Sequence, residues 1–108
     1  MNGDDGVVLI RNGAARAEIA PACGALTLRC TVDGRDLLHC PENWRAAWPG
    51  RVRFGNPLLF PVASHVTHEG RAGWHHSRGQ DFRMPQHGCV RELPWRVASR
   101  SDDAVTCG

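Results

Sequence analysis

The densest cluster of reactive side chains lies in the segment 84–91, which reads Met-Pro-Gln-His-Gly-Cys-Val-Arg. Pro85 restricts the backbone that approaches His87, and Gly88 removes a side chain that would crowd a ligand. The imidazole of His87 is therefore expected to be held in place and yet approachable. Because histidine donates and accepts protons near neutral pH, the segment predicts acid–base chemistry on a bound ligand. For a histidine taken alone, a loop residue that caps backbone groups is the competing interpretation.

Four further histidines gather in the preceding stretch, at His65, His68, His75 and His76. Neutral imidazole is a common metal ligand, so a zinc or copper site is one interpretation of this group. The spacing matches no zinc pattern, however, and the stretch is dotted with glycine and lacks a helix that would present the ligands together. We therefore expect solvated loop histidines, with no metal site and no cofactor.

Short antiparallel strands are expected to position these residues. The dipeptides Asn12-Gly13 and Asp33-Gly34 separate apolar runs. Such pairs are a strong local signal for a β-hairpin, because a type I′ turn needs positive φ at both central residues. The first forty residues therefore predict a β-meander.

One strand of this meander shows a period of two. Leu26, Leu28, Cys30 and Val32 alternate with Thr27, Arg29 and Thr31. This alternation is typical of a half-buried antiparallel sheet, so the four apolar residues are expected on one buried face.

The later segments are expected to be short or irregular. Prolines limit 41–50 to one helical turn and 57–63 to an edge or irregular path, and 67–85 reads as a long loop without either period. The segments 94–100 and 104–107 predict a final hairpin, with Trp95 in the core. The predicted fold class is all-β, an incomplete antiparallel β-sandwich, in which 1–108 is a single partial domain.

Composition excludes several classes of function. The chain has 13 basic residues, all arginine, against 11 acidic ones, so its net charge of +2 does not indicate a nucleic-acid partner. Without lysine there is no Schiff-base chemistry and no phosphate-loop lysine. The apolar runs are too short to span a bilayer, and five cysteines without a C-x-x-C pair indicate reduced, mostly buried thiols. We expect a soluble cytoplasmic protein with no membrane partner.

Three parts of the sequence, taken in order, resemble the aldose 1-epimerase (galactose mutarotase-like) family. These are the opening hairpin 23–38, the segment 55–61 (GNPLLFP), which is similar to a G-x-P-x-L-F-P motif, and the His-Gly-x-x-Arg segment with Trp95 after it. The resemblance implies the amino-terminal portion of a large β-sandwich that interconverts sugar anomers by ring opening. It covers nearly this whole chain.

The resemblance also implies roles for particular residues. His87 is the catalytic candidate, contacting the sugar near its ring oxygen, whereas the later histidine and glutamate of the family have no match before Gly108. Cys89 stands where the family usually has an aromatic residue. Sugar contacts are expected from Arg51, Arg53, Asn56, Trp74, Gln86 and Arg91, although a structural ion pair of Arg91 with Glu92 or Asp81 is an equal alternative.

The expected partner is a monosaccharide, either a hexose or a hexose phosphate. By this interpretation the chain alone, as a truncated form, has little isomerase activity. The alternative is a noncatalytic carbohydrate-binding or assembly module that forms a homodimer through an exposed sheet edge.

Overall fold

Antiparallel β-structure dominates the chain in the computed structural model, which describes residues 6–49, 53–60, 63–64, 67–68, 70–72, 74–75, 81–82 and 86–108. Helix is limited, within these residues, to a 3-10 turn, η2 (Pro21–Cys23), and one α-helical turn, α1 (Trp44–Ala47). The predicted all-β class is confirmed, as is the single helical turn between the prolines. No helix in the described ranges is both long enough and apolar enough to cross a membrane.

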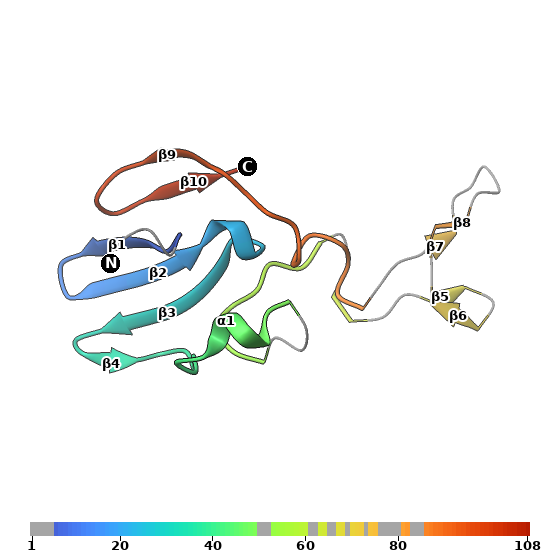
Figure 1. Ribbon diagram of the computed structural model, residues 1–108, viewed down its shortest axis with the longest axis horizontal. Coiled ribbons are helices and arrows are strands. Elements are labelled where there is room, and N and C mark those ends of the chain that lie inside the picture. The colour runs from blue at the N-terminus through green and yellow to red at the C-terminus, as the bar shows by residue number, and fades with distance from the viewer. Residues whose placement is uncertain are drawn as a thin grey trace.

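A four-stranded antiparallel sheet forms the body of the molecule (Figure 1). In order across the sheet, its strands are β1 (Val8–Asn12), β2 (Ala15–Ala20), β3 (Leu26–Val32) and β4 (Arg35–Asp36). Both predicted hairpins are present, and this region of the chain is the meander that the turn dipeptides indicated.

The two hairpin turns differ in detail. Asp33 and Gly34 have φ of 51° and 75°, the positive values that a type I′ turn requires. In the first hairpin Asn12 pairs with Ala15, so the connection is Gly13-Ala14, one residue later than predicted. The reason is that Gly13, at φ 60°, supplies the positive φ at the first position of this two-residue loop.

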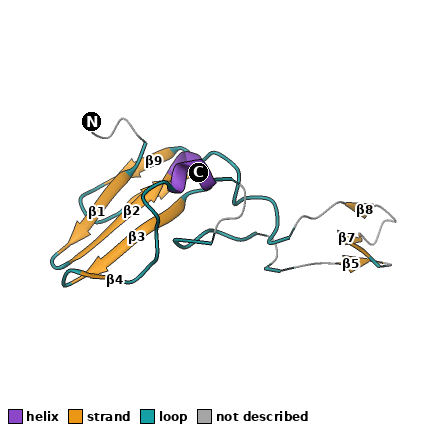
Figure 2. Ribbon diagram, turned by 60° about the horizontal axis from the view of Figure 1, so that its bottom comes forward, coloured by secondary structure: helices purple, strands orange, loops and turns teal. Residues whose placement is uncertain are grey.

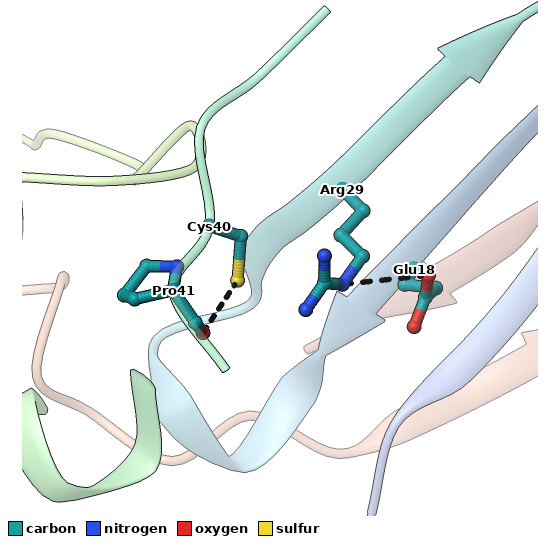
Figure 3. A network of polar contacts seen from close by, with 4 residues as sticks. All are labelled: Glu18, Arg29, Cys40 and Pro41. Carbon is teal, nitrogen blue, oxygen red and sulfur yellow. Dashed lines mark hydrogen bonds and ion pairs between the residues drawn. The ribbon is translucent and has the colours of Figure 1, made fainter. Parts of the chain in front are cut away.

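The pairing of β2 with β3 contains a β-bulge. Glu18 lies opposite Arg29 and Ile19 opposite Thr27, so Leu28 has no direct partner on β2. The side chains of this Glu18–Arg29 pair form an ion pair between the two strands, with 3.8 Å between Arg29 Nε and Glu18 Oε2 (Figure 3). A simple alternation of residues does not predict such a bulge.

Burial of β3 changes along its length. Leu26 and Leu28 are 2% and 1% exposed, whereas Val32 is 38% exposed. The expectation of one fully buried face is therefore right for the first half of the strand and wrong for the second. What differs is the cover, because Trp44 of α1 and Phe54 pack with Leu26 and Leu28, whereas Val32 is outside this core cluster among the residues that the structure describes.

We call the buried half of the sheet the covered end, defined by its core cluster, and the half that carries the loops 13–14 and 33–34 the turn end. The covered end consists of Ala20, Cys23, Leu26, Leu28, Trp44 and Phe54.

The final hairpin is formed by β9 (Val97–Arg100) and β10 (Val105–Cys107), as the sequence predicts. Trp95, expected in the core, is only half-buried. Its backbone N–H donates to Pro21 O at 2.9 Å, so it joins the hairpin to the sheet rather than filling the interior.

The stretch predicted as a loop without strands contains two small antiparallel ladders. Their strands are two residues long: β5 (Thr67–His68) pairs with β6 (Arg71–Ala72), and β7 (Trp74–His75) pairs with β8 (Asp81–Phe82). In both views these strands lie apart from the four-stranded sheet (Figures 1 and 2). We call these four short strands, β5 to β8, the arm. The arm extends the molecule, so the radius of gyration of the chain is 16.4 Å, against about 13 Å for a compact domain of about 100 residues.

Candidate functional site

The two motif segments, 55–61 and 84–91, meet in the structure. Phe60 forms an isolated parallel bridge with Gly88, and the Cys89 N–H donates to Phe60 O at 2.8 Å. As expected, 57–60 follows an irregular path outside any named strand. Segments far apart in sequence are thus joined directly at the glycine that follows His87.

His87 is held by two reciprocal hydrogen bonds with Ser64. The His87 N–H donates to Ser64 O at 2.7 Å, and the Ser64 N–H donates to His87 Nδ1 at 2.8 Å. Both residues have left-handed backbone conformations, with φ of 66° and 70°. Left-handed conformation costs a non-glycine residue roughly 1–2 kcal/mol, and such outliers gather at functional sites.

These bonds determine which ring nitrogen of His87 carries the proton. A backbone N–H only donates, so Nδ1 must accept and the neutral imidazole is protonated at Nε2. The ring is half-buried. His87 therefore presents a hydrogen-bond donor, at an atom that the clamp to Ser64 does not use.

The segment around His87 is attached to the covered end of the sheet. Gly24 N–H donates to Leu93 O at 2.9 Å. A Cβ placed on Gly24 would collide with the backbone carbonyl of Arg91, and Gly24 itself has φ of 71°. Glycine is therefore required at this position for two reasons, and the close approach fixes the distance between the sheet and the histidine segment.

A small pocket of about 150 Å³ lies beside His87 and is lined by Gln86, Gly88, Cys89, Arg91 and Glu92. Two of the predicted sugar-binding residues, Gln86 and Arg91, are therefore brought together. Three of the lining residues carry side chains that can bind hydroxyls: the amide of Gln86, the guanidinium of Arg91 and the carboxylate of Glu92. His87 does not line this pocket, so it is a neighbour of the pocket rather than part of its wall.

The expected ion pair of Arg91 with Glu92 is not formed, although the structure describes both residues. The alternative partner, Asp81, lies in β8, where only the backbone is described. Arg91 is half-buried and lines the pocket, which is compatible with the ligand-binding role implied by the family resemblance.

The other predicted contacts do not gather around His87 in the described residues. Asn56 bonds through its backbone to Thr27, donating to Thr27 O at 2.8 Å, and its side chain is exposed, as is that of Arg53. Trp74 lies in β7, where only its backbone is described, and Arg51 lies outside the described residues. The structure therefore supports a smaller site than the sequence predicted.

All five cysteines are free, but they are less buried than expected. Cys23 is buried and Cys89 is exposed, while Cys30, Cys40 and Cys107 are intermediate. Burial raises the pKa of the Cys23 thiol, an effect that the positive charge of Arg45 partly opposes. Burial also raises the pKa of Cys40, whose Sγ lies 3.6 Å from Pro41 O (Figure 3).

No group of three or more histidine, cysteine or acidic residues that could hold a metal ion is found among the described residues. His65 and His76 lie outside these residues, and for His68 and His75 only the backbone is described. The sequence-based expectation about these histidines therefore stays a prediction.

Ser64 is a residue of the candidate site that sequence reasoning missed. It precedes His87 by 23 residues and belongs to no motif. Its contribution is made through backbone atoms, which any residue type carries, so no side-chain pattern could have identified it.

The fold and the site together define an all-β protein of antiparallel sheets with a clamped histidine at one end of its main sheet. A scan against protein-family models finds no match, and a search of curated proteins finds none either. Among solved structures, the Slr1438 protein from Synechocystis sp. PCC 6803 is similar, with a TM-score of 0.74 and 28% sequence identity. The alignment covers 88% of this chain and 32% of that one. The chain therefore shares that fold and spans about a third of that protein's length.

Proposed function

We propose that this chain carries the first sugar-contacting segment of an aldose 1-epimerase-like protein. The substrate class is a free hexose or hexose phosphate, whose anomers interconvert through ring opening. His87 donates a hydrogen bond from Nε2 to the ring oxygen, and Gln86 and Arg91 bind hydroxyl groups nearby. The proposal includes a soluble, cytoplasmic setting.

The observation that carries the proposal is the clamp between Ser64 and His87. Ring opening needs a proton at the ring oxygen while another leaves the anomeric hydroxyl. A histidine whose Nδ1 accepts a backbone N–H carries its proton on Nε2, so it can support the first task by donating a hydrogen bond to the ring oxygen. The direct contact of the two motif segments at Phe60 and Gly88 also supports the proposal that these segments form one sugar-contacting site.

The resemblance assigns the acid and the base that complete the reaction to a later histidine and a glutamate, which have no match in these 108 positions. We therefore propose that the chain alone binds sugar weakly and does not accelerate anomer exchange. With one of three central groups present, the geometry can polarise the ring oxygen but cannot complete the proton transfer.

Titration with galactose, followed by NMR of the ¹⁵N-labelled chain, tests the binding step. We expect shifts of the amides in 86–92 at millimolar galactose, and their loss in His87→Ala. The control variant is His39→Ala, since the side chain of His39 is exposed and lies outside the site. If saturating galactose leaves the amides of 86–92 unchanged, the proposal is wrong.

A noncatalytic carbohydrate-binding module is the second candidate function. It is favoured by the pocket, whose polar lining from Gln86, Arg91 and Glu92 does not include His87. Optical rotation of freshly dissolved galactose separates the two. Binding that survives His87→Ala supports the module, whereas accelerated anomer exchange that this variant abolishes would show that the chain is an isomerase by itself.

A further inference from the structure

Strand β1 is the edge of the four-stranded sheet, and two of its outward-facing backbone groups have partners. Arg11 N–H donates to Asp102 O at 2.7 Å, and Arg100 Nη2 donates to Leu9 O at 3.1 Å. In an antiparallel ladder, alternate residues direct their backbone groups toward and away from the paired strand. Because Leu9 and Arg11 are two residues apart, both groups lie on the edge that faces away from β2.

The partners come from the turn between β9 and β10, which is organised by its own hydrogen bonds. Ser101 N–H donates to Ala104 O at 2.8 Å, and Ser101 Oγ donates to Asp103 Oδ1 at 3.0 Å. The turn therefore presents the carbonyl of Asp102 to the edge in a prepared position, while Arg100 adds a second contact.

This contact is limited to a few polar groups and is not a packed interface. An open groove of about 860 Å³ remains between the two hairpins, lined by Leu9, Arg11, Asn12, Gly13, Arg100, Ser101, Asp102 and Asp103. The side chain of Arg100 is exposed. Regions held by exposed hydrogen bonds with little apolar burial are the ones that open at low free-energy cost.

The two backbone groups that the turn covers, the Arg11 N–H and the Leu9 carbonyl, could also pair with the same groups of a second copy of β1. If a second β1 lay antiparallel to the first with its two-fold axis at Ile10, Leu9 of one copy would face Arg11 of the other. The Arg11 N–H would then reach the Leu9 carbonyl of the partner copy, and no like charges would be directly opposite. The two four-stranded sheets would become one continuous sheet, an isologous arrangement.

We propose that the β9–β10 turn is a reversible cap on the β1 edge, and that it keeps two copies of this chain from pairing through β1. Unpaired strand edges are templates for association, and proteins commonly cover them. The occupant that the cap excludes is a second copy of the same strand. This inference is independent of the proposed sugar site.

The test compares Arg100→Leu with Arg96→Leu, which places the same side chain on the same hairpin, outside the cap. At a dilution where it is monomeric, Arg100→Leu is expected to speed hydrogen exchange at the Arg11 amide about tenfold, near the range for losing one charged hydrogen bond; at higher concentration, pairing with the Leu9 carbonyl of a second copy would protect this amide again. We also expect a dimer in sedimentation equilibrium, with no change of either kind in Arg96→Leu. If Arg100→Leu does not fold, Ser101→Ala, which removes only the hydroxyl bond inside the turn, takes its place.

A double variant, Arg100→Leu with Arg11→Pro, identifies the interface. Proline lacks the N–H that points away from β2, and proline is tolerated on an outer edge. We expect this variant to return to a monomer. The proposal is overturned if the Arg11 amide exchanges at the same rate in Arg100→Leu, if it exchanges faster while the chain stays monomeric, or if the double variant still dimerises.

Discussion

The covered end and the turn end of the main sheet share the long strands β2 and β3, yet the core cluster lies at only one of them in the described residues. Leu28 is 1% exposed, and Val32, four residues later on the same strand, is 38% exposed. Both belong to the apolar alternation of β3. The difference comes from Trp44 and Phe54, which pack only over the covered end. The comparison teaches that strand periodicity shows which residues can be buried, while the connections that cross the sheet decide which of them are.

The candidate site belongs to the covered end. The histidine segment is joined to Gly24 through Leu93 and to Pro21 through Trp95, both by backbone hydrogen bonds of 2.9 Å. Changes that loosen the covered end should therefore reach the site, whereas changes at the turn end should not.

The largest expected effect comes from removing side-chain volume at the covered end. Leu28→Ala should lower the free energy of unfolding by about 2–5 kcal/mol, because it leaves a cavity among buried neighbours. Val32→Ala, its matched control at the turn end, should change it by no more than about 0.5 kcal/mol. Urea titration of the two variants measures both values. Equal losses would show that the turn end is as tightly packed as the covered end.

A smaller effect is expected from glycine replacement. Gly24 and Gly13 have similar φ, 71° and 60°, but an added Cβ meets the Arg91 carbonyl at Gly24 and open space at Gly13. Gly13→Ala should cost about 1–2 kcal/mol for the left-handed backbone alone, and Gly24→Ala should cost about 1–3 kcal/mol more, because its Cβ collides with backbone atoms. The difference between the two unfolding midpoints isolates the collision. NMR of Gly24→Ala should show shifts in 86–93, and an unperturbed segment there would contradict the proposed link between sheet and site.

The smallest effect concerns reactivity and leaves stability unchanged. Alkylation at pH 8 should modify the exposed Cys89 first, the half-buried Cys40 more slowly and the buried Cys23 last, with roughly tenfold or more between the first and the last, because thiolates react and burial shields them. Burial raises the pKa of Cys23 and Cys40, so at a given alkaline pH a smaller fraction of each is thiolate in the folded chain than in the unfolded chain. Mass spectrometry of timed samples gives the order. In concentrated urea the three rates should converge, and a Cys23 that reacts as fast as Cys89 in the folded chain would argue against its burial.

Much of the main sheet could be predicted from sequence because its signals are local. Asp33-Gly34 specifies its turn through the φ of two adjacent residues, and Pro41 and Pro49 confine α1 to a single turn. The one-residue shift at Gly13 is also local in origin. These features depend on neighbouring residues, which a sequence displays directly.

The site could be predicted only in part, because its contacts are long-range. The motif around His87 identified Gln86 and Arg91, which line the pocket. The clamp to Ser64 and the bulge at Leu28 depend on backbone atoms and on pairing register, and neither leaves a side-chain pattern. The motif around Asn56 predicts a sugar contact, but the structure shows only that its backbone is hydrogen-bonded to Thr27 of the sheet.

Two contacts close the base of the arm: the hydrogen bond between Phe60 and Cys89 and the pair of hydrogen bonds between Ser64 and His87. Both contacts join a residue that precedes the arm to one that follows it, so the imidazole is held by hydrogen bonds at the base of the arm. Closing a flexible loop costs only about 0.6 kcal/mol more for each doubling of its length. Insertions within 65–85 can therefore alter what the arm presents to a ligand, while the histidine and the sheet behind it stay where they are.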